Sequence, residues 1–344
     1  MATIKDVAKV AGVSVSTVSR VINNSASVVP VKREAVQAAM EQLNYQPNSL
    51  ARALVSNRSD CIGLLVGEIE SPFFGQLMAG VHRVVMAAGK HVIVTAGYHQ
   101  LEQERDGIRF MQERRCDALV IHSKALPDEE LIRLLEGDKP VFLLNRQIPG
   151  WEDCCIHLDN EYGAYLATRH LISRGHRNIA HISTSIAIED GESRLSGYAN
   201  ALQEAGIEFD EQKVIKAYPD EEGGGYAMSE LMARNLDLTA VFAYNDAMAA
   251  GAMTMLQDAG RLVPEELSVV GFDDVILARI LKPHLTTIRY PINEMGALAA
   301  QRVLHALDER YKANEQALRF TPRLIERQSV LSIRRQTLKS SGQG

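Results

Sequence analysis

The sequence predicts an α/β protein in which a small helical head is followed by a body of two lobes, each built on a doubly wound parallel sheet. The chain has 344 residues, which is too long for one compact core and suits two or three domains. Helical patterns fill its first 58 residues, whereas short β-rich apolar runs alternate with helical stretches from Cys61 onward. We therefore expect a helix-turn-helix head at 1–46, a hinge helix and linker at 47–59, a body at 60–335 and a tail at 336–344.

The head begins with two short amphipathic helices that meet at a tight Gly-Val-Ser turn. Gly12 supplies a turn that a residue with a Cβ would resist, and Ser14 is placed to cap the second helix. This is the pattern of a helix-turn-helix unit, whose second helix enters the major groove of DNA. The apolar residues expected to face inward are Ile4, Val7, Ala8 and Ala11 in the first helix and Val18, Val21 and Ile22 in the second.

A third helix and a short hinge helix complete the predicted N-terminal region. The third helix is expected at about 31–44, with Pro30 near its first turn, where a missing N–H costs nothing. Pro47 stops or restarts a helix, and Asn48 can cap a short one at 49–54. A helix this brief is not stable alone in water, so we expect it to fold only when two subunits meet on DNA.

The body is expected to contain parallel sheets because strand-like runs of four to six residues recur every twenty to thirty residues with helices between them. About 270 residues are too many for one such sheet, so we expect two similar lobes with a cleft between them. Nearly all runs end in a loop that holds Gly, Asn, Asp or His, and open α/β sheets bind ligands beyond the carboxyl ends of their strands. The runs are CIGLLVG, HVIVTAG, DALVIHS, PVFLLN, IAHIS, LTAVFAYND, LSVVGFDD and LTTIRY.

The net charge of −6 is divided unevenly along the chain. Residues 1–58 carry seven basic and three acidic groups, a net of +4, which leaves −10 for the remainder. A basic head on an acidic body is expected when only the head meets phosphate groups.

Several classes of protein are disfavoured by the sequence. The N-terminus shows no apolar segment of a signal peptide, and no apolar run is long enough to cross a bilayer, so we expect a cytoplasmic protein. The four cysteines are irregularly spaced, which favours buried, reduced thiols. The glycines at 223–225 lack the Lys-Ser/Thr of a phosphate-binding loop, and the histidines show no metal spacing. No spacing indicates a catalytic triad or paired carboxylates, so we expect neither an enzyme nor a cofactor or metal.

The head TIKDVAKVAGVSVSTVSRVINN and the hinge NYQPNSLARAL resemble those of the lactose-repressor family of bacterial transcription regulators. The body carries further motifs of that family in the right order: SPFF (71–74), GHRNIAHI (175–182), RLSGY (194–198), AYND (243–246), GFDD (271–274) and PxLTTIRYP (283–291). Three more segments are most similar to galactose-responsive members: GYH (97–99), LLNRQIPG (143–150) and YNDAMAAGAM (244–253). The resemblance covers about residues 3–330 and implies a homodimer with a periplasmic-binding-protein-like body.

The resemblance implies DNA-reading roles for residues of the head. Base contacts fall on Val15, Ser16 and Arg20: Val15 can touch a thymine methyl, and Arg20 can pair with guanine O6 and N7. The alternatives are core packing for Val15 and a solvated charge for Arg20. Phosphate contacts, which position the head without reading sequence, are expected from Thr3, Ser14, Thr17, Ser19 and Asn23, with helix capping and solvation as the alternative for each.

The same resemblance gives the hinge a role in bending DNA. Asn48 caps the hinge helix, and Ala51 and Leu54 project from one face of it. Leu54 is expected to enter the minor groove and unstack the central step of the operator, and domain-interface packing is the alternative. One departure from the family lies before the third helix, where Val29 replaces the usual Ser or Thr and cannot cap or contact phosphate through an oxygen. Lys32 is a candidate substitute for that phosphate contact.

The resemblance also implies an effector site between the lobes. A sugar site needs paired hydrogen-bonding groups and an apolar face, and family positions supply both. Of the adjacent carboxylates Asp273 and Asp274, we expect the first to contact the ligand and the second to cap a helix. Asp246 is expected to orient its loop. The effector-binding residues implied are Phe73, Phe74, His122, Asn145, Arg194, Asn245 and Asp273.

We therefore expect a dimeric repressor of sugar uptake or catabolism genes that binds a pseudo-palindromic operator and is released by a sugar, D-galactose. The first lobe is expected at about 60–158 and 290–318 and the second at about 159–289 and 319–335. The alternatives are a regulator of the same family with another sugar or a purine as effector, or a sugar-binding transport protein. The basic head and the missing signal peptide speak against the last.

Overall fold

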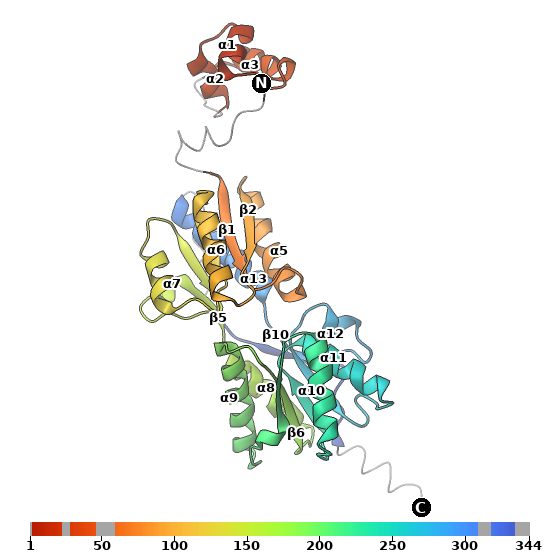
Figure 1. Ribbon diagram of the computed structural model, residues 1–344. Helices are drawn as coiled ribbons and strands as arrows, with labels where there is room; N and C mark the ends of the chain where they lie inside the picture. Colours follow the sequence, from red (N-terminus) through yellow and green to blue (C-terminus); the bar gives the residue numbers. More distant parts are fainter. Residues whose placement is uncertain (1, 23–27, 46–58, 309–317, 334–344) are drawn as a thin grey trace, which may run out of the picture. The chain divides into compact units, whose positions relative to one another are not determined.

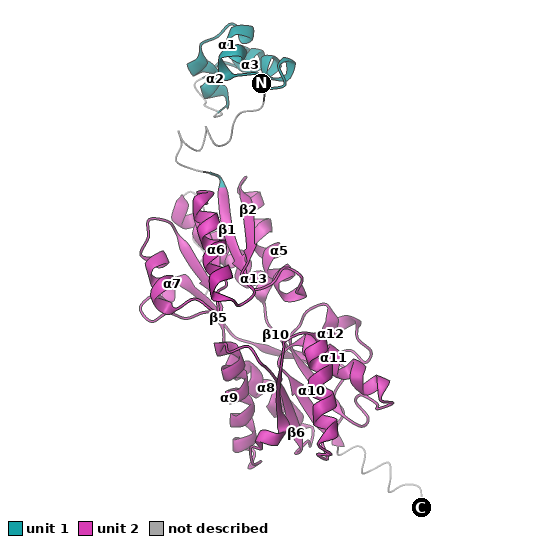
Figure 2. Ribbon diagram, viewed as in Figure 1, with its two compact units in different colours: residues 1–60 teal, residues 61–344 magenta. Residues whose placement is uncertain are grey.

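The computed structural model describes residues 2–22, 28–45, 59–308 and 318–333 and divides the chain into two compact units, residues 1–60 and 61–344 (Figure 2). The first is the helical head, and the second holds both sheets.

The head consists of α1 (Ile4–Ala11), α2 (Val15–Ile22) and α3 (Pro30–Gln42). Helix α1 starts in a capping box, in which Thr3 and Asp6 each hydrogen-bond the other's backbone N–H, and ends at Gly12 with φ of 61°. Ser14 Oγ accepts the N–H of Thr17 at 3.2 Å, which confirms it as the cap of α2. The three helices enclose one small core around the fully buried Val7, Val18 and Val36.

The start of α3 has the weakness that the sequence predicts. Val29 is its N-cap residue and makes no side-chain capping hydrogen bond, while Pro30 occupies the first helical position. The side chain of Val29 is 57% exposed. The first-turn N–H groups of α3 are therefore not satisfied by the side chain at their N-cap position.

The first lobe is built on a parallel sheet of order β11-β5-β4-β3-β1-β2. Helices α5 and α13 share a core with one face of the sheet, and α6 and α7 share another core with the opposite face. The strands are β1 (Cys61–Val66), β2 (His91–Ala96), β3 (Ala118–Ile121), β4 (Val141–Leu144), β5 (Cys155–Leu158) and β11 (Arg319–Phe320). The helices are α5 (Pro72–Ala87), α6 (Leu101–Glu113), α7 (Asp128–Leu135), α13 (Ile292–Leu307) and the 3-10 turn η1 (Glu152–Cys154).

The second lobe repeats this architecture with the order β12-β10-β9-β8-β6-β7, in which only β12 pairs antiparallel. Helices α8 and α9 cover one face and α10 and α11 the other (Figure 1). The strands are β6 (Ile179–Thr184), β7 (Val214–Ala217), β8 (Ala240–Ala243), β9 (Ser268–Asp273), β10 (Thr286–Arg289) and β12 (Arg323–Ile325). The helices are α8 (Asn160–Ser173), α9 (Glu189–Glu204), α10 (Glu221–Ala233), α11 (Asp246–Asp258), α12 (Leu277–Ile280) and the 3-10 turn η2 (Glu211–Lys213).

The chain passes between the lobes three times: from β5 to α8, from β10 to α13 and from β11 to β12. The last passage lies between Phe320 and Arg323, because Arg319 pairs with His157 in the first sheet. The second segment of the first lobe thus extends two residues beyond the expected end at 318. All eight apolar runs form strands, and the predicted α/β class is confirmed.

Candidate functional site

A cleft between the lobes encloses about 720 Å³, part of it open to solvent. It lies beyond the carboxyl ends of the strands in both sheets. In each sheet the strand order reverses at one point, between β1 and β3 and between β6 and β8, and open α/β sheets bind ligands at such points. The cleft takes residues from the segments after β1, β3 and β8, which places it at both reversals.

Six of the seven expected effector residues line this cleft. The first lobe contributes Phe73 and Phe74 from α5 and His122 from the segment after β3. The second contributes Arg194, Asn245 and Asp273. Residues far apart in the chain are thus brought together as the sequence predicts.

The apolar part of the cleft is formed by aromatic rings at the start of α5. Phe74 is 6% exposed and packs in the core of the first lobe, while Phe73 is half-buried. The two rings pack edge to face, with centroids 5.1 Å apart and planes at 85°. Phe73 also contacts the ring of Tyr290 at 4.9 Å. Of the two phenylalanines, Phe74 thus packs inward and Phe73 keeps part of its surface toward the cleft.

Arg194 is the buried cation of the second lobe. Its Nε donates to Asn160 Oδ1 at 3.0 Å and its Nη1 to the carbonyl oxygen of Tyr244 at 2.5 Å. The guanidinium lies 3.7 Å from the ring centroid of Phe272, and Nη2 lies 3.7 Å from Asp273 Oδ1. A buried charge needs this kind of support, because desolvation penalises an unpaired guanidinium.

Four buried polar atoms of the cleft have no hydrogen-bond partner among the described residues: His99 Nδ1, His122 Nδ1, Asp273 Oδ1 and the Tyr290 hydroxyl. Each unpaired buried polar group costs about 1–3 kcal/mol, so such groups point to a ligand that pairs with them. Burial, followed by the nearby charge of Lys124, lowers the pKa of His122 to about 3, so this ring is neutral. Burial raises the pKa of Asp273 to about 7, against the opposing effect of Arg194.

The carboxylates and the amide near the cleft separate into distinct roles. Asn245 caps α11 by accepting the N–H of Met248, and its Nδ2 donates to the Pro219 carbonyl. Asp246 is fully buried and accepts the N–H of Val275 at 2.9 Å, so it holds the loop after β9, whereas the sequence led us to expect its own loop. Asp274 pairs with Arg327 at 2.5 Å and is not the N-cap of α12, so the capping role expected for it is wrong.

Asn145 does not line the cleft, contrary to its expected contact with the effector. Its Nδ2 donates to Asp190 Oδ2 at 2.6 Å, and its Oδ1 accepts from Asn160 Nδ2 at 3.3 Å. The side chain is turned toward these neighbouring polar groups, and the backbone of Asn145 after β4 is left-handed (φ 54°). It positions residues of the site instead of reaching into it.

The backbone around the cleft is strained at several non-glycine residues. His99 has φ of 54° and Asp273 has φ of 112°, values that L-residues rarely adopt. Both follow or end a strand and line the cleft. Strained backbone of this kind gathers at functional sites, where it aims a side chain that a relaxed backbone would turn away.

In the head, the residues expected to read bases are accessible on α2. Val15 is 41% exposed, and Ser16 and Arg20 are exposed as well, so Val15 is not a core residue. Arg20 has no ion-pair partner within the described part of the head. The expected phosphate contacts Thr3 and Ser14 are exposed and already serve as helix caps, while Thr17 and Ser19 are half-buried. Asn23, Asn48, Ala51 and Leu54 lie outside the described residues.

Comparison with known proteins decides the family. Residues 3–48 match the model of the bacterial regulatory proteins of the lacI family, and residues 168–330 match the periplasmic binding protein-like domain. The chain is 47% identical over 330 residues to the HTH-type transcriptional regulator GalR of Escherichia coli strain K12, covering 96% of each protein. The chain belongs to the lacI family of bacterial regulatory proteins.

Two further similarities place this lacI-family chain among its relatives. It is 37% identical over 333 residues to the HTH-type transcriptional repressor PurR of Erwinia tasmaniensis, covering 96% of this chain and 97% of that protein. The crystal structure of the lac repressor dimer bound to operator and the anti-inducer ONPF matches with a TM-score of 0.84 and 27% identity, covering 96% of this chain and 99% of that one. The chain is therefore a transcription regulator and not an enzyme.

Some polar residues of this lacI-family cleft were not predicted from the sequence. Lys124, Asp190, His99 and Tyr290 all line it, and Lys124 and Asp190 form an ion pair of 2.7 Å. Two of them carry a local signal in the sequence, since His99 follows an apolar run in GYH and Tyr290 ends the run LTTIRY. The described residues contain no cluster of His, Cys, Asp and Glu that could hold a metal ion. In the same part of the chain, no helix has the length and apolar character needed to span a bilayer.

Proposed function

We propose that the protein is a cytoplasmic, galactose-responsive transcription repressor that binds a pseudo-palindromic operator as a homodimer and joins the nucleoid when bound. Galactose in the cleft favours a lobe arrangement that separates the paired hinges, and the operator is then released. The effect is limited by how much more tightly the sugar binds that arrangement than the DNA-binding one.

The observation that carries this proposal is the set of four unpartnered buried polar atoms in the cleft. A sugar hydroxyl both donates and accepts, so it can pair with a neutral imidazole nitrogen, a carboxylate or a phenol in either sense. His99 and His122 offer such atoms from the first lobe, and Asp273 and Tyr290 offer them near the second. Phe73 adds an apolar surface for the C–H face of a pyranose.

The choice of galactose is supported by similarity. GalR of E. coli is 47% identical to this chain over nearly its whole length, against 37% for PurR of E. tasmaniensis. A purine is the second candidate, since the edge-to-face pair of Phe73 and Tyr290 offers aromatic surface to a flat base.

The test joins operator selection to a ligand titration. The preferred operator is first selected from random DNA with the full chain, and its affinity is then measured against rising galactose. Galactose should weaken operator binding, while glucose, its C4 epimer, should act at much higher concentration. Calorimetry against a panel of sugars and purines identifies the effector directly. Tighter operator binding with galactose, or unchanged binding, would contradict the assignment of galactose as the inducing effector.

A further inference from the structure

A buried ion pair joins the two lobes inside the cleft. Lys124 follows β3 in the first lobe, and Asp190 lies in the first turn of α9 in the second. Lys124 Nζ lies 2.7 Å from Asp190 Oδ1, and the two side chains are only 2% and 9% exposed. Both residues line the cleft. The pair therefore touches both lobes and the space between them.

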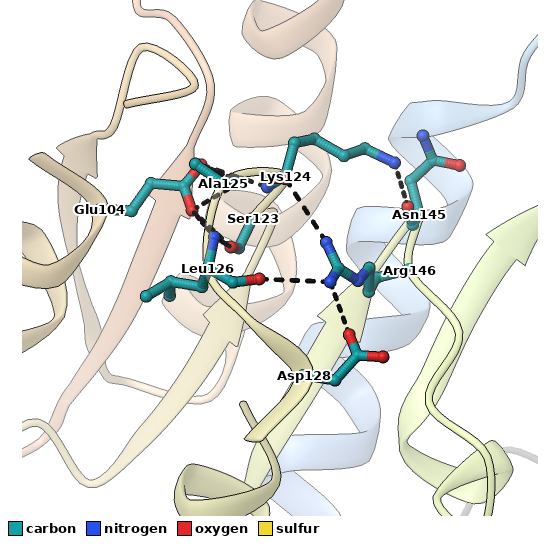
Figure 3. A network of polar contacts seen from close by, with 8 residues as sticks. All are labelled: Glu104, Ser123, Lys124, Ala125, Leu126, Asp128, Asn145 and Arg146. Carbon is teal, nitrogen blue, oxygen red and sulfur yellow. Dashed lines mark hydrogen bonds and ion pairs between the residues drawn. The ribbon is translucent and has the colours of Figure 1, made fainter. Parts of the chain in front are cut away.

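The turn that carries Lys124 is held by Glu104 of α6, which is itself 1% exposed (Figure 3). The Glu104 carboxylate accepts the backbone N–H groups of Lys124, Ala125 and Leu126 and the hydroxyl of Ser123. On the other side of the turn, Arg146 Nη2 donates to the carbonyl of Leu126. This support fixes the direction of the lysine side chain before any ligand binds.

Asp190, the other member of the ion pair, is also held by hydrogen bonds. Its Oδ2 accepts Asn145 Nδ2 at 2.6 Å, and the carbonyl of Asn145 accepts a hydrogen bond from Lys124 Nζ. Burial alone would raise the pKa of Asp190, but the charges of Lys124 and Arg194 hold it below its ordinary value. Asp190 is therefore a carboxylate at neutral pH, and the charge of Lys124 helps to keep it ionised.

The ammonium group retains one unused donor. Lys124 has three N–H groups, of which the Asn145 carbonyl and Asp190 Oδ1 accept two. The third has no acceptor among the described residues, and the side chain lines the cleft. A hydroxyl oxygen in the cleft can accept it.

We propose that Lys124 determines effector binding by donating its third N–H to an effector hydroxyl while its bond to Asp190 holds the two lobes closed around that effector. The proposal rests on the proposed function for the identity of the ligand, but the bridge between the lobes exists without it. Because the contact to Asp190 crosses the cleft, it is complete only when the lobes are closed. It therefore acts on dissociation of the effector more than on its association.

The first test measures galactose binding to the full chain by calorimetry and stopped flow. Lys124→Met should weaken affinity about 10- to 100-fold, as expected for loss of a charge-assisted hydrogen bond. Most of this loss should appear as faster dissociation. Asp190→Asn should also weaken binding, and the double variant should lose less than the two single losses combined, because each single change breaks the same bridge. The double variant leaves no unpaired buried charge, so it remains informative if Lys124→Met folds poorly.

The matched control is Lys90→Met. Lys90 forms a buried ion pair with Asp117 at 3.2 Å, and the side chains are 8% and 4% exposed, but both residues belong to the first lobe. This variant should lose stability yet bind galactose with wild-type affinity and dissociation rate. An equal loss in Lys90→Met, or wild-type binding by Lys124→Met, overturns the proposal.

A ligand-free measurement separates this proposal from the choice of effector. Small-angle scattering of the full chain without sugar should show a larger mean radius of gyration for Lys124→Met than for wild type and Lys90→Met. If the wild type binds no sugar, the assignment of galactose fails while a larger radius still supports the lobe bridge. An unchanged radius overturns the bridge, whatever the effector is.

Discussion

Nη2 of Arg194 lies 3.7 Å from Oδ1 of Asp273, and both side chains are buried in the second lobe's side of the cleft. The distance is too long for a hydrogen bond, so the carboxylate oxygen keeps its capacity to accept one. The pair thus supplies charge balance within the protein and leaves a hydrogen-bonding atom for the contents of the cleft.

Replacing Arg194 with Met should damage both stability and effector binding. The change removes the charge that faces Asp273 and the donors that serve Asn160 and Tyr244. Breaking a buried pair by removing one partner costs about 3–5 kcal/mol. Urea unfolding should show a loss of this order, and calorimetry should show weaker galactose binding. Arg169→Met is the control: Arg169 is exposed on α8, so its loss should stay within about 0.5 kcal/mol. Equal losses in both variants contradict the role of Arg194.

Asp273→Asn should change how stability depends on pH. Burial raises the folded-state pKa of Asp273 from 3.8 to about 7. Between about pH 4 and 7 the unfolded state releases a proton that the native state keeps, so this contribution to stability is lost as pH rises through 7. Asparagine has no such proton. The unfolding free energy of the variant relative to wild type should therefore rise across this window, by at most about 1.4 kcal/mol per pH unit. Denaturant unfolding at several pH values measures this difference. A difference that does not change with pH would contradict the raised pKa of Asp273.

Gly251 allows α11 to cross α10 closely, and Gly251→Ala should destabilise the second lobe. A Cβ at Gly251 would lie 1.8 Å from the backbone oxygen of Glu221, so the two helices must separate. Overpacking of this kind costs about 1–3 kcal/mol. Gly225→Ala is the matched control, since its Cβ would meet its nearest neighbour at 3.6 Å and should be neutral or stabilise by up to about 1 kcal/mol. Thermal unfolding compares the stabilities of the two variants. An equal change in stability for both would contradict the close crossing of α10 and α11 at Gly251.

Val29→Ser should strengthen the start of α3. Val29 has the extended backbone of an N-cap residue (φ −62°, ψ 145°), but its side chain forms no capping hydrogen bond. A serine hydroxyl at an N-cap is worth about 0.5–2 kcal/mol relative to a side chain without one. Thermal unfolding followed by hydrogen exchange in the head should detect the gain, and operator affinity should rise if the hydroxyl also reaches a phosphate. Val29→Ala removes bulk without adding a cap and should show neither effect.

Most of the strands that the sequence predicts are buried on both faces, and the edge strand β2 is the exception. A run such as Leu64–Val66 between two helical layers is apolar throughout, so it is visible without any knowledge of its neighbours. The strands β5, β7, β11 and β12 were not predicted. Three of them lie at sheet edges, and they are short or include polar residues such as His157 and Lys216, so their pairing depends on a neighbour that local sequence does not show.

Part of the site was predictable from residues at strand ends, whereas the contact between the two lobes was not. His122 and Asp273 belong to strand ends, which share one edge of a sheet whatever the rest of the fold does. Lys124 and Asp190 stand 66 residues apart in different lobes, and their contact depends on how the lobes close. Asn145 also shows what local sequence leaves out. It follows the end of a strand as predicted, but its side chain hydrogen-bonds Asp190 of the other lobe instead of lining the cleft.

Leu54→Ala should reduce both operator affinity and DNA bending while leaving effector binding unchanged. Leu54 lies outside the described residues, and the prediction rests on the role that the resemblance to the lactose-repressor family implies for it in the short segment 49–54. An apolar wedge unstacks a base step and kinks the duplex, and the bend admits more protein contact. Alanine is too short to fill the opened step, so the kink should relax. Fluorescence transfer between dyes on the two ends of a short operator measures the bend. Leu262→Ala is the control, since Leu262 is 59% exposed in the second lobe and should change neither affinity nor bending. A wild-type bend in Leu54→Ala would show that Leu54 packs between protein segments instead of base pairs.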